Sequence, residues 1–192
     1  MNLNLKNRSL WKVDVKTIVA IGIGAALFFV LGRFVAIPSP VPNTTISIQY
    51  GLLAFMAACF GPIAGLLIGL IGHFLIDLSA GWGVWWSWVI ASGVFGFIVG
   101  LLGNRTRLAW GQFGTKGAIN FNIAQVIGHV VAWIVIAPVL DILIYAEPAN
   151  KVFLQGAVAA AANIVTTAII GTLLCFAWAK IVPDKESLHK ED

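Results

Sequence analysis

The sequence predicts an all-α integral membrane protein, a bundle of six transmembrane helices with both termini in the cytoplasm. Three observations lead to this fold class. Of 192 residues, 59% are hydrophobic and only 10% are charged, whereas about a quarter of the residues of a soluble domain carry a charge. The apolar residues form long runs, each near the roughly 20 residues that a helix needs to cross a bilayer. Finally, the basic residues gather in alternate connections, which is typical of membrane topology.

Six apolar runs are the expected spans, and together they make up a single membrane domain over residues 1–192. In chain order they cover about 14–36, 46–60, 62–78, 84–102, 118–140 and 152–179. Only Gly61 and Pro62 separate the second run from the third. Because one helix of about thirty residues would overrun the bilayer, a tight reversal is favoured here over a single kinked span. Residues 37–47 and 141–151 are the expected outer connections.

The basic residues orient these spans. With six spans and a cytoplasmic N-terminus, only Arg33 and Lys151 fall on the outer side. The remaining basic residues fall on the cytoplasmic side: Lys6, Arg8, Lys12, Lys16, Arg105, Arg107, Lys116, Lys180, Lys185 and Lys190. This asymmetry follows the positive-inside rule. An odd number of spans would place the C-terminal lysines outside, so the charges favour an even number.

Polar side chains inside the expected spans predict a binding pocket. His73 and Asp77 are four residues apart and therefore share one helix face. An ionisable group in the hydrocarbon core costs at least about 2.5 kcal/mol unless it faces a partner or a wet cavity. Polar residues of four spans fall at similar depths in the middle and outer membrane, so we expect them to face one another. The candidate substrate-binding residues are Asn43, Gln49, Tyr50, His73, Asp77, Trp85, Trp86, Trp88, Gln125, His129 and Asn163. The alternative for each is structural: a mutually satisfied pair, an amide that joins two helices, or a turn residue.

The stretch GWGVWWSW, residues 81–88, holds four of the eight tryptophans of the chain. Any one of them fits an interfacial aromatic belt. At helical spacing, however, neighbouring positions point about 100° apart, so the four indoles cannot all face lipid. We therefore expect at least one to turn inward, where an indole beside amides and a carboxylate suits a flat, polar heteroaromatic ring.

Several motifs are missing from the sequence. There is no GxxxxGK[ST] phosphate loop, no HExxH and no cysteine–histidine cluster, so neither an enzyme, a metal site nor a cofactor is expected. A binding protein without its own ATPase needs a partner that supplies the energy. In the first span, "AIGIGAA" spaces small residues four apart, Ala20 with Gly24 and Gly22 with Ala26. Such spacing allows close helix approach, either to a partner or within the bundle.

Four stretches of the sequence resemble a known family. They are VKTIVAIGIGAALFFVLGRF, PNTTISIQYGLLAFMAACFGPIAGLLIGLIGH, WWSWVIASG and APVLDILIYAEPANKVFLQG. They are similar to the substrate-binding S components of energy-coupling factor (ECF) vitamin transporters. More narrowly, they resemble the uncharacterised or riboflavin-type subfamily, which includes a hydroxymethylpyrimidine-type lactobacillal protein.

The resemblance implies a six-helix bundle in the cell membrane that binds a vitamin near its outer face. It also implies two kinds of partner, a transmembrane coupling subunit (T component) and two cytoplasmic ATPase subunits. The S component would topple in the membrane as its partners cycle through ATP. Ala20, Gly22, Gly24 and Ala26 are similar to the docking motif of the family, and the loop around Asn43 would be a lid over the site.

The expected ligand is a small ring with hydroxymethyl and amino or hydroxyl groups, either hydroxymethylpyrimidine or a pyridoxine-like pyridine. Riboflavin is the alternative vitamin. Two other classes of function stay open. "ASGVFG" around Ser92 resembles the serine motif of intramembrane proteases, with His129 as base, although Ile90 stands where that motif has glycine. A self-sufficient secondary carrier, driven by an ion gradient, is the other.

Overall fold

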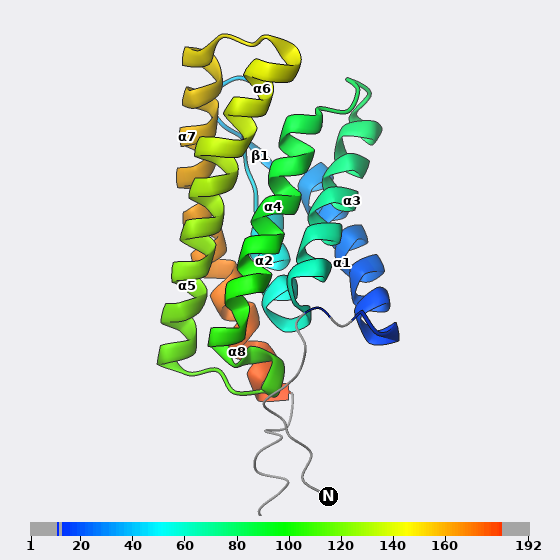
Figure 1. The fold of residues 1–192 in the computed structure, drawn as a ribbon, viewed down its shortest axis with the longest axis vertical. Coiled ribbons are helices and arrows are strands. Elements are labelled where there is room, and N and C mark those ends of the chain that lie inside the picture. The colour runs from blue at the N-terminus through cyan, green and yellow to red at the C-terminus, as the bar shows by residue number, and fades with distance from the viewer. Residues whose placement is uncertain (1–10, 12, 182–192) are drawn as a thin grey trace, which may run out of the picture.

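The structure is a computed structural model that describes residue 11 and residues 13–181, and the fold is almost entirely helical (Figure 1). Its first half contains α1 (Val15–Phe34), α2 (Gln49–Phe60), α3 (Pro62–Ala80) and α4 (Trp86–Gly103). Two single 3-10 turns, η2 (Asn104–Thr106) and η3 (Leu108–Trp110), lead into the second half. There α5 (Thr115–His129), η4 (Val130–Ile136) and α6 (Ala137–Tyr145) follow one another without a break, as do α7 (Ala149–Thr166), η5 (Thr167–Gly171) and α8 (Thr172–Ile181).

Five continuous helices in the described residues are long and apolar enough to cross a membrane. They are Val15–Phe34, Pro62–Ala80, Trp86–Gly103, Thr115–Tyr145 and Ala149–Ile181. The expected second span is different, because α2 has only 12 residues. At 1.5 Å per residue it is about 18 Å long, short of the ~30 Å hydrocarbon core. Eleven of its residues, from Gln49 to Cys59, are buried, so α2 is the central helix of the bundle.

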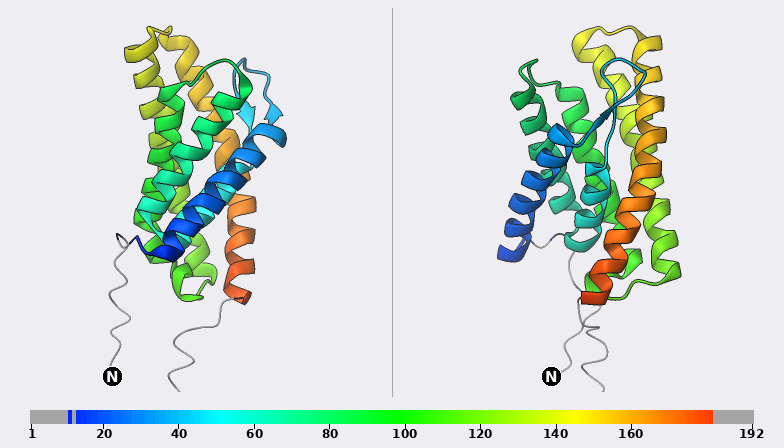
Figure 2. Two further views of the ribbon diagram at one scale, coloured as in Figure 1. Left: turned by 90° about the vertical axis from the view of Figure 1, so that its right-hand side faces the viewer. Right: turned by 180° about the vertical axis from the view of Figure 1, so that it is seen from behind.

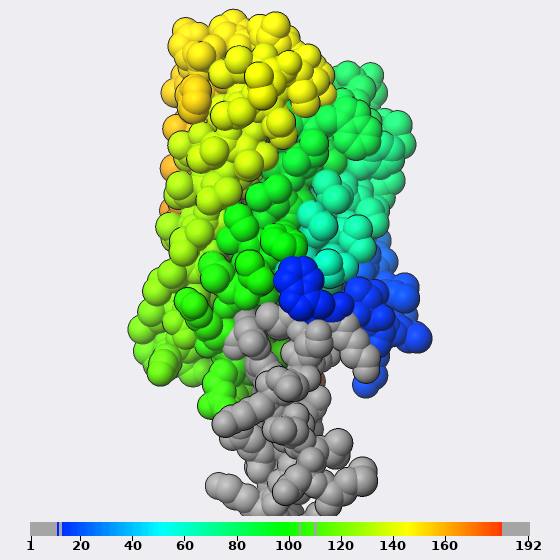
Figure 3. All heavy atoms as spheres, in the orientation of Figure 1, coloured from blue at the N-terminus to red at the C-terminus, as the bar shows by residue number. Residues whose placement is uncertain are grey.

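Glycines decide two features of the packing. The predicted reversal between α2 and α3 is confirmed at Gly61, whose φ of 94° turns the chain, and Pro62 then opens α3. Gly65 of α3 and Gly96 of α4 face each other: a Cβ added to either would lie 2.2 Å from the carbonyl oxygen of the other. Only glycine allows these two backbones to approach so closely. Figure 3 shows the face on which α4 lies between α3 and the α5–α6 helix.

The expected outer connection at 141–151 is helical for most of its length. Helix α6 continues to Tyr145, α7 starts at Ala149, and only residues 146–148 between them are not helical. The predicted fifth span therefore extends five residues further, beyond residue 140. The physical reason is that Asp141, the charge that suggested a loop, is buried against donors from another helix.

Before α2 the chain forms a small hairpin instead of an irregular loop. Strands β1 (Ile37–Pro38) and β2 (Thr45–Ile46) pair antiparallel. Figure 2 shows the hairpin beside α7. Two hydrogen bonds hold it there: Gln155 Nε2 donates to the Pro42 carbonyl and Thr166 Oγ1 donates to the Ser47 carbonyl, each at 2.9 Å. The hairpin thus lies across one end of the bundle, opposite the end where α1 begins and α8 stops.

Candidate ligand-binding cavity

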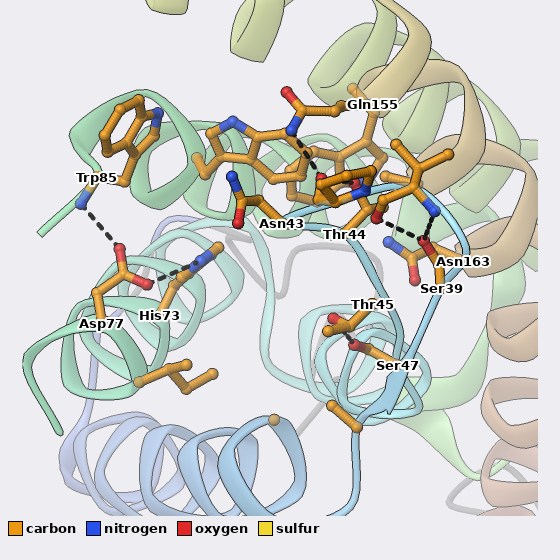
Figure 4. A pocket seen from close by; sticks show the side chains of 18 of the residues that line it. Ser39, Asn43, Thr44, Thr45, Ser47, His73, Asp77, Trp85, Gln155 and Asn163 are labelled. Atoms are coloured by element: carbon orange, nitrogen blue, oxygen red, sulfur yellow. Dashed lines mark hydrogen bonds and ion pairs between the residues drawn. The ribbon is translucent and has the colours of Figure 1, made fainter. Parts of the chain in front are cut away.

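A cavity of about 690 Å³ lies under the hairpin, between α3 and α7 (Figure 4). Ligand pockets commonly measure ~300–1,000 Å³. Eight of the eleven predicted binding residues line it: Asn43, Gln49, Tyr50, His73, Asp77, Trp85, Trp88 and Asn163. The convergence expected from similar depths in different helices is therefore present for these residues. Ligand contact by any of them stays a prediction.

Three predicted residues do not line the cavity: Trp86, Gln125 and His129. Trp86 is 49% exposed and stacks on Phe74 with ring centroids 5.8 Å apart, which fits an aromatic belt. Gln125 and His129 are buried deeper in the bundle, outside the cavity. Depth along a helix places a residue at the right height but does not say which way it faces, and these three side chains lie away from the cavity.

His129 instead holds one wall of the cavity in position. Its Nδ1 accepts a hydrogen bond of 2.9 Å from Trp133 Nε1, and its Nε2 lies 3.0 Å from Thr167 Oγ1. Trp133 lines the cavity, with its ring centroid 5.2 Å from that of Trp88 and 5.3 Å from that of Tyr50. These three rings form the aromatic wall of the cavity, and its orientation rests on His129.

Asp141 explains the tryptophan cluster. This carboxylate is only 1% exposed, and three donors, from Trp85 and from the first turn of α4 that follows it, converge on it. Oδ1 accepts from Trp85 Nε1 at 2.6 Å and from the Ser87 hydroxyl, while Oδ2 accepts from Trp88 Nε1 at 2.8 Å. The ring of Trp85 also stacks on Tyr145, with centroids 4.2 Å apart. Two of the four indoles therefore turn inward, and both donate to one buried carboxylate.

A second carboxylate, Asp77, stands on the α3 wall (Figure 4). Its Oδ2 accepts the backbone N–H of Trp85 at 2.9 Å. Its Oδ1 lies 3.7 Å from His73 Nε2, which is longer than a hydrogen bond. His73 Nδ1 lies 2.6 Å from Ser92 Oγ, and Ser92 Oγ lies 3.0 Å from the Tyr50 hydroxyl. A polar chain thus runs from the cavity into the core.

The protease geometry considered from the sequence is not formed. Ser92 is fully buried and its hydroxyl contacts His73 and Tyr50, whereas both ring nitrogens of His129 are occupied by Trp133 and Thr167. A nucleophile needs its base within hydrogen-bond reach and access for the substrate. Ser92 and His129 meet neither condition, so the pair is not a catalytic dyad.

Two amide oxygens at the cavity have no partner. Among the described residues, the buried side-chain oxygens without a hydrogen bond are Gln49 Oε1, Asn163 Oδ1 and, outside the cavity, Gln125 Oε1. Gln49 is 5% exposed and Asn163 is 2% exposed. Buried polar atoms are nearly always hydrogen-bonded, and exceptions often mark places where a bound molecule completes the bond.

Charges also line the rim of the cavity. Arg33 lies in the last turn of α1, with its guanidinium carbon 5.8 Å from the centroid of the Phe34 ring. Glu147 and Lys151 also lie on the rim and form an ion pair of 2.6 Å.

Several lining residues were absent from the predicted set, and three of them shape the site most: Asp141, Trp133 and Gln155. For two of them a signal was present, since His129, Trp133 and Asp141 follow one another at multiples of four residues, which predicts one helix face. Gln155 gave no comparable signal, because its partner is a backbone carbonyl 113 residues earlier in the chain.

The four small residues of α1 divide into two pairs. Ala20 and Gly24 are buried inside the bundle, where a Cβ added to Gly24 would lie 2.7 Å from Ile68 Cδ1. Gly22 and Ala26 are exposed, and a Cβ added to Gly22 would meet no atom within 4 Å. Packing within the chain therefore accounts for Ala20 and Gly24, and the docking prediction now rests on Gly22 and Ala26 alone.

Comparison with known proteins places the chain in a family. A family model described as "ECF-type riboflavin transporter, S component" matches residues 12–180. The chain is 53% identical over 180 residues to a UPF0397 protein of Enterococcus faecalis, covering 94% of this chain and 98% of that protein. It is 58% identical over 176 residues to a UPF0397 protein of an Exiguobacterium species, covering 92% and 96%.

A solved structure of the S component of a bacterial ECF transporter is 19% identical, with a TM-score of 0.45 over 91% of this chain and 96% of that chain. The family model alone spans most of the sequence, and the described residues contain five membrane-length helices. The chain therefore belongs to the family of ECF-type riboflavin transporter S components and is a multi-pass membrane protein.

Proposed function

We propose that this protein is the substrate-binding subunit of an ECF-type importer and captures a small water-soluble vitamin or vitamin precursor at the outer face of the membrane. Hydroxymethylpyrimidine or a pyridoxine-like pyridine is the preferred ligand. One observation carries this proposal: the same cavity joins an aromatic wall to two buried amide oxygens that have no partner.

The aromatic wall and the two amide oxygens would contact different parts of one ligand. Trp88, Trp133 and Tyr50 present ring surfaces, which favour a flat apolar face. Gln49 and Asn163 present polar atoms, which favour N–H or O–H groups at the edge of the ring. A small heteroaromatic ring with amino and hydroxymethyl substituents supplies both.

Riboflavin is the second candidate, and two observations favour it. The cavity volume of about 690 Å³ leaves room for a tricyclic ring with a sugar-alcohol chain. The family description also names riboflavin. A flavin would extend further along the aromatic wall and its ribityl hydroxyls would supply donors.

Within this proposal, the short α2 and the extended chain that leads into it from the hairpin make one pass together, and the five long helices make the other five (Figure 1). Both termini then lie in the cytoplasm and the cavity faces outward. The basic connection between α4 and α5, which contains Arg105 and Arg107, then lies inside, as the positive-inside rule requires. The proposed partners are a transmembrane coupling subunit and two ATPase subunits. The exposed Gly22 and Ala26, flanked by exposed apolar side chains of α1, form the proposed docking surface for the coupling subunit.

Native mass spectrometry of the purified protein, released gently from detergent, tests the ligand directly. A pyrimidine or pyridine carried from the host would support the preferred ligand, and a flavin would support the second candidate. If the protein emerges empty, tryptophan fluorescence titrations against a vitamin panel follow. Failure of every vitamin to bind would refute the proposal. Uptake that persists without ATPase subunits and follows an ion gradient would identify a secondary carrier instead.

Substitution of Gly22 by leucine tests the docking surface. A leucine there fills open space, so we expect unchanged stability and vitamin binding but reduced uptake when the coupling subunit and ATPases are present. Co-purification of the coupling subunit with the variant should fall in parallel. The matched control is Ile119→Leu, on the exposed face of α5, where uptake should not change. Full uptake by the Gly22→Leu variant would exclude this face as the docking surface.

A further inference from the structure

Some of the hydrogen-bonding groups that line the cavity already have partners within the protein, and others do not. Three of the cavity's N–H donors are already occupied: the indole N–H groups of Trp85 and Trp88 donate to Asp141, and the amide N–H of Gln155 donates to Pro42. The buried side-chain atoms at the cavity that have no hydrogen bond are acceptors. They are the amide oxygens of Gln49 and Asn163, joined by Asp77 Oδ1.

Asp77 differs from the two amides in one respect. An amide that turns over can donate as well as accept, but an ionised carboxylate can only accept. Asp77 is 4% exposed and lines the cavity, and one of its oxygens is held by the Trp85 backbone. In the described residues no hydrogen bond to the other oxygen is formed, and His73 Nε2 lies 3.7 Å from it. The α3 wall therefore offers a fixed acceptor that a bound molecule can complete.

The charged groups around the cavity also favour a ligand without negative charge. Over the described ranges, neither Asp77 nor Asp141 has a lysine or arginine within ion-pair distance. Of the two cations on the rim, Lys151 is paired with Glu147 and Arg33 lies over the ring of Phe34. A phosphate ester carries about −1.5 to −2 charge at neutral pH. Placed beside two carboxylates of low exposure, such a group is disfavoured by like-charge repulsion.

We propose that Asp77 is a specificity-determining residue: the cavity selects ring ligands that present an N–H donor to the α3 wall and rejects anionic forms, phosphate esters above all. This inference rests on the proposed function of the cavity as a vitamin site. It narrows the ligand class to uncharged or cationic amino-substituted heterocycles, with Gln49 and Asn163 accepting from further donors of the same ring.

A ligand series tests the proposal on the full-length protein in detergent, with tryptophan fluorescence as the readout. The probes are hydroxymethylpyrimidine, its analogue with hydrogen in place of the amino group, and its phosphate ester. We expect the analogue without the amino group to bind about 10- to 100-fold more weakly, the range for a lost hydrogen bond to a charged group. The phosphate ester should bind more weakly still. Equal affinity for the compounds with and without the amino group, or for the alcohol and its phosphate ester, would overturn the proposal.

The variant Asp77→Asn separates this role from a structural one. Its amide oxygen can keep the bond to Trp85, so the variant should remain folded while the preference for the amino form falls to within about threefold. The matched control is Ser79→Ala on the same helix, where the serine is exposed and outside the cavity; it should keep the full preference. An unchanged preference in Asp77→Asn would overturn the proposal. The series with the unaltered protein needs no variant, so it decides the question even if Asp77→Asn fails to fold.

Riboflavin and its phosphate ester are tested in parallel. Binding of riboflavin but of no pyrimidine would refute the preferred ligand, while rejection of the flavin phosphate would still support exclusion of anions. Tight binding of both flavin forms would overturn that exclusion and point to Arg33 and Lys151 on the rim as a phosphate site. The two proposals therefore fail in distinguishable ways.

Discussion

Asp141 and Asp77 are both buried carboxylates at the edge of one cavity, yet their surroundings are opposite. Asp141 accepts from two indoles and a serine hydroxyl, so its lone pairs are used within the protein. Asp77 accepts from one backbone N–H, and its second oxygen has only a distant histidine. A satisfied carboxylate holds helices together, whereas one with an open position is suited to a ligand. Low exposure alone would not have separated the two roles.

Among the tests proposed here, the matched substitutions Asp141→Asn and Asp77→Asn should differ most in their effect on the free energy of unfolding. In Asp141→Asn one acceptor oxygen becomes an amino group that faces the indole N–H of Trp88 or Trp85, so a buried donor loses its partner. We expect a loss of about 1–3 kcal/mol in the free energy of unfolding. Asp77→Asn should cost much less, since the Trp85 backbone bond can persist.

Thermal unfolding in detergent, followed by near-UV circular dichroism of the tryptophans, measures both variants side by side. The near-UV signal should change most in Asp141→Asn, because the Trp85 and Trp88 rings are oriented through that carboxylate. Equal stability of the two variants would contradict the division between a structural and a ligand-facing aspartate.

Asn163 and Asn122 differ in the same way as Asp77 and Asp141, and substituting them should change stability and binding less. Asn163 lines the cavity with an unpartnered oxygen, whereas Asn122 donates to the Ala118 carbonyl at 2.9 Å and to Thr172 Oγ1 at 3.0 Å. Asn163→Leu should leave stability unchanged or raise it, because an apolar side chain removes an unsatisfied group, but it should weaken vitamin binding about tenfold. Asn122→Leu should lower stability by up to about 1.5 kcal/mol and leave binding intact.

Calorimetric titration of the vitamin, paired with thermal unfolding of each variant, separates these outcomes. If Asn163→Leu binds as well as the unaltered protein, its open oxygen is no part of the ligand site. If Asn122→Leu also loses binding, the effect of either substitution is one of general packing.

Much of the helical fold could be predicted from the sequence, because hydrophobic runs and charge asymmetry report on the bilayer. The start of α3 at Pro62 follows directly from the chemistry of glycine and proline. The short α2 could not be predicted, since an apolar run looks the same whether protein or lipid surrounds it. The end of α6 was misplaced because Asp141 suggests a loop until its three donors are known.

The residues of the site could be predicted only in part, because the sequence does not report how each helix is rotated. His73 and Asp77 share a helix face by spacing alone, and both line the cavity. Gln125 and His129 have the same polarity at a similar depth but lie outside it. Periodicity places residues along one helix, whereas the rotation of that helix depends on its neighbours. The bond from Gln155 to the hairpin is an extreme case, since it joins residues 113 positions apart.

The hairpin gives the smallest expected effect and the last test of the comparison. Asp141 tethers the start of α4 and the preceding Trp85 to α6 through three bonds. In the part of the chain that the structure describes, side chains tether the hairpin to α7 at two points, Gln155 to Pro42 and Thr166 to Ser47. Gln155→Met keeps the length of the side chain and removes one tether, so the unfolding midpoint should hardly change. The vitamin should then dissociate a few-fold faster in stopped-flow fluorescence while the association rate stays within about twofold, as expected when the bound state loses part of its cover. If the hairpin is only a rigid rim, both rates will stay as they are, and ligand retention will depend on the cavity walls alone.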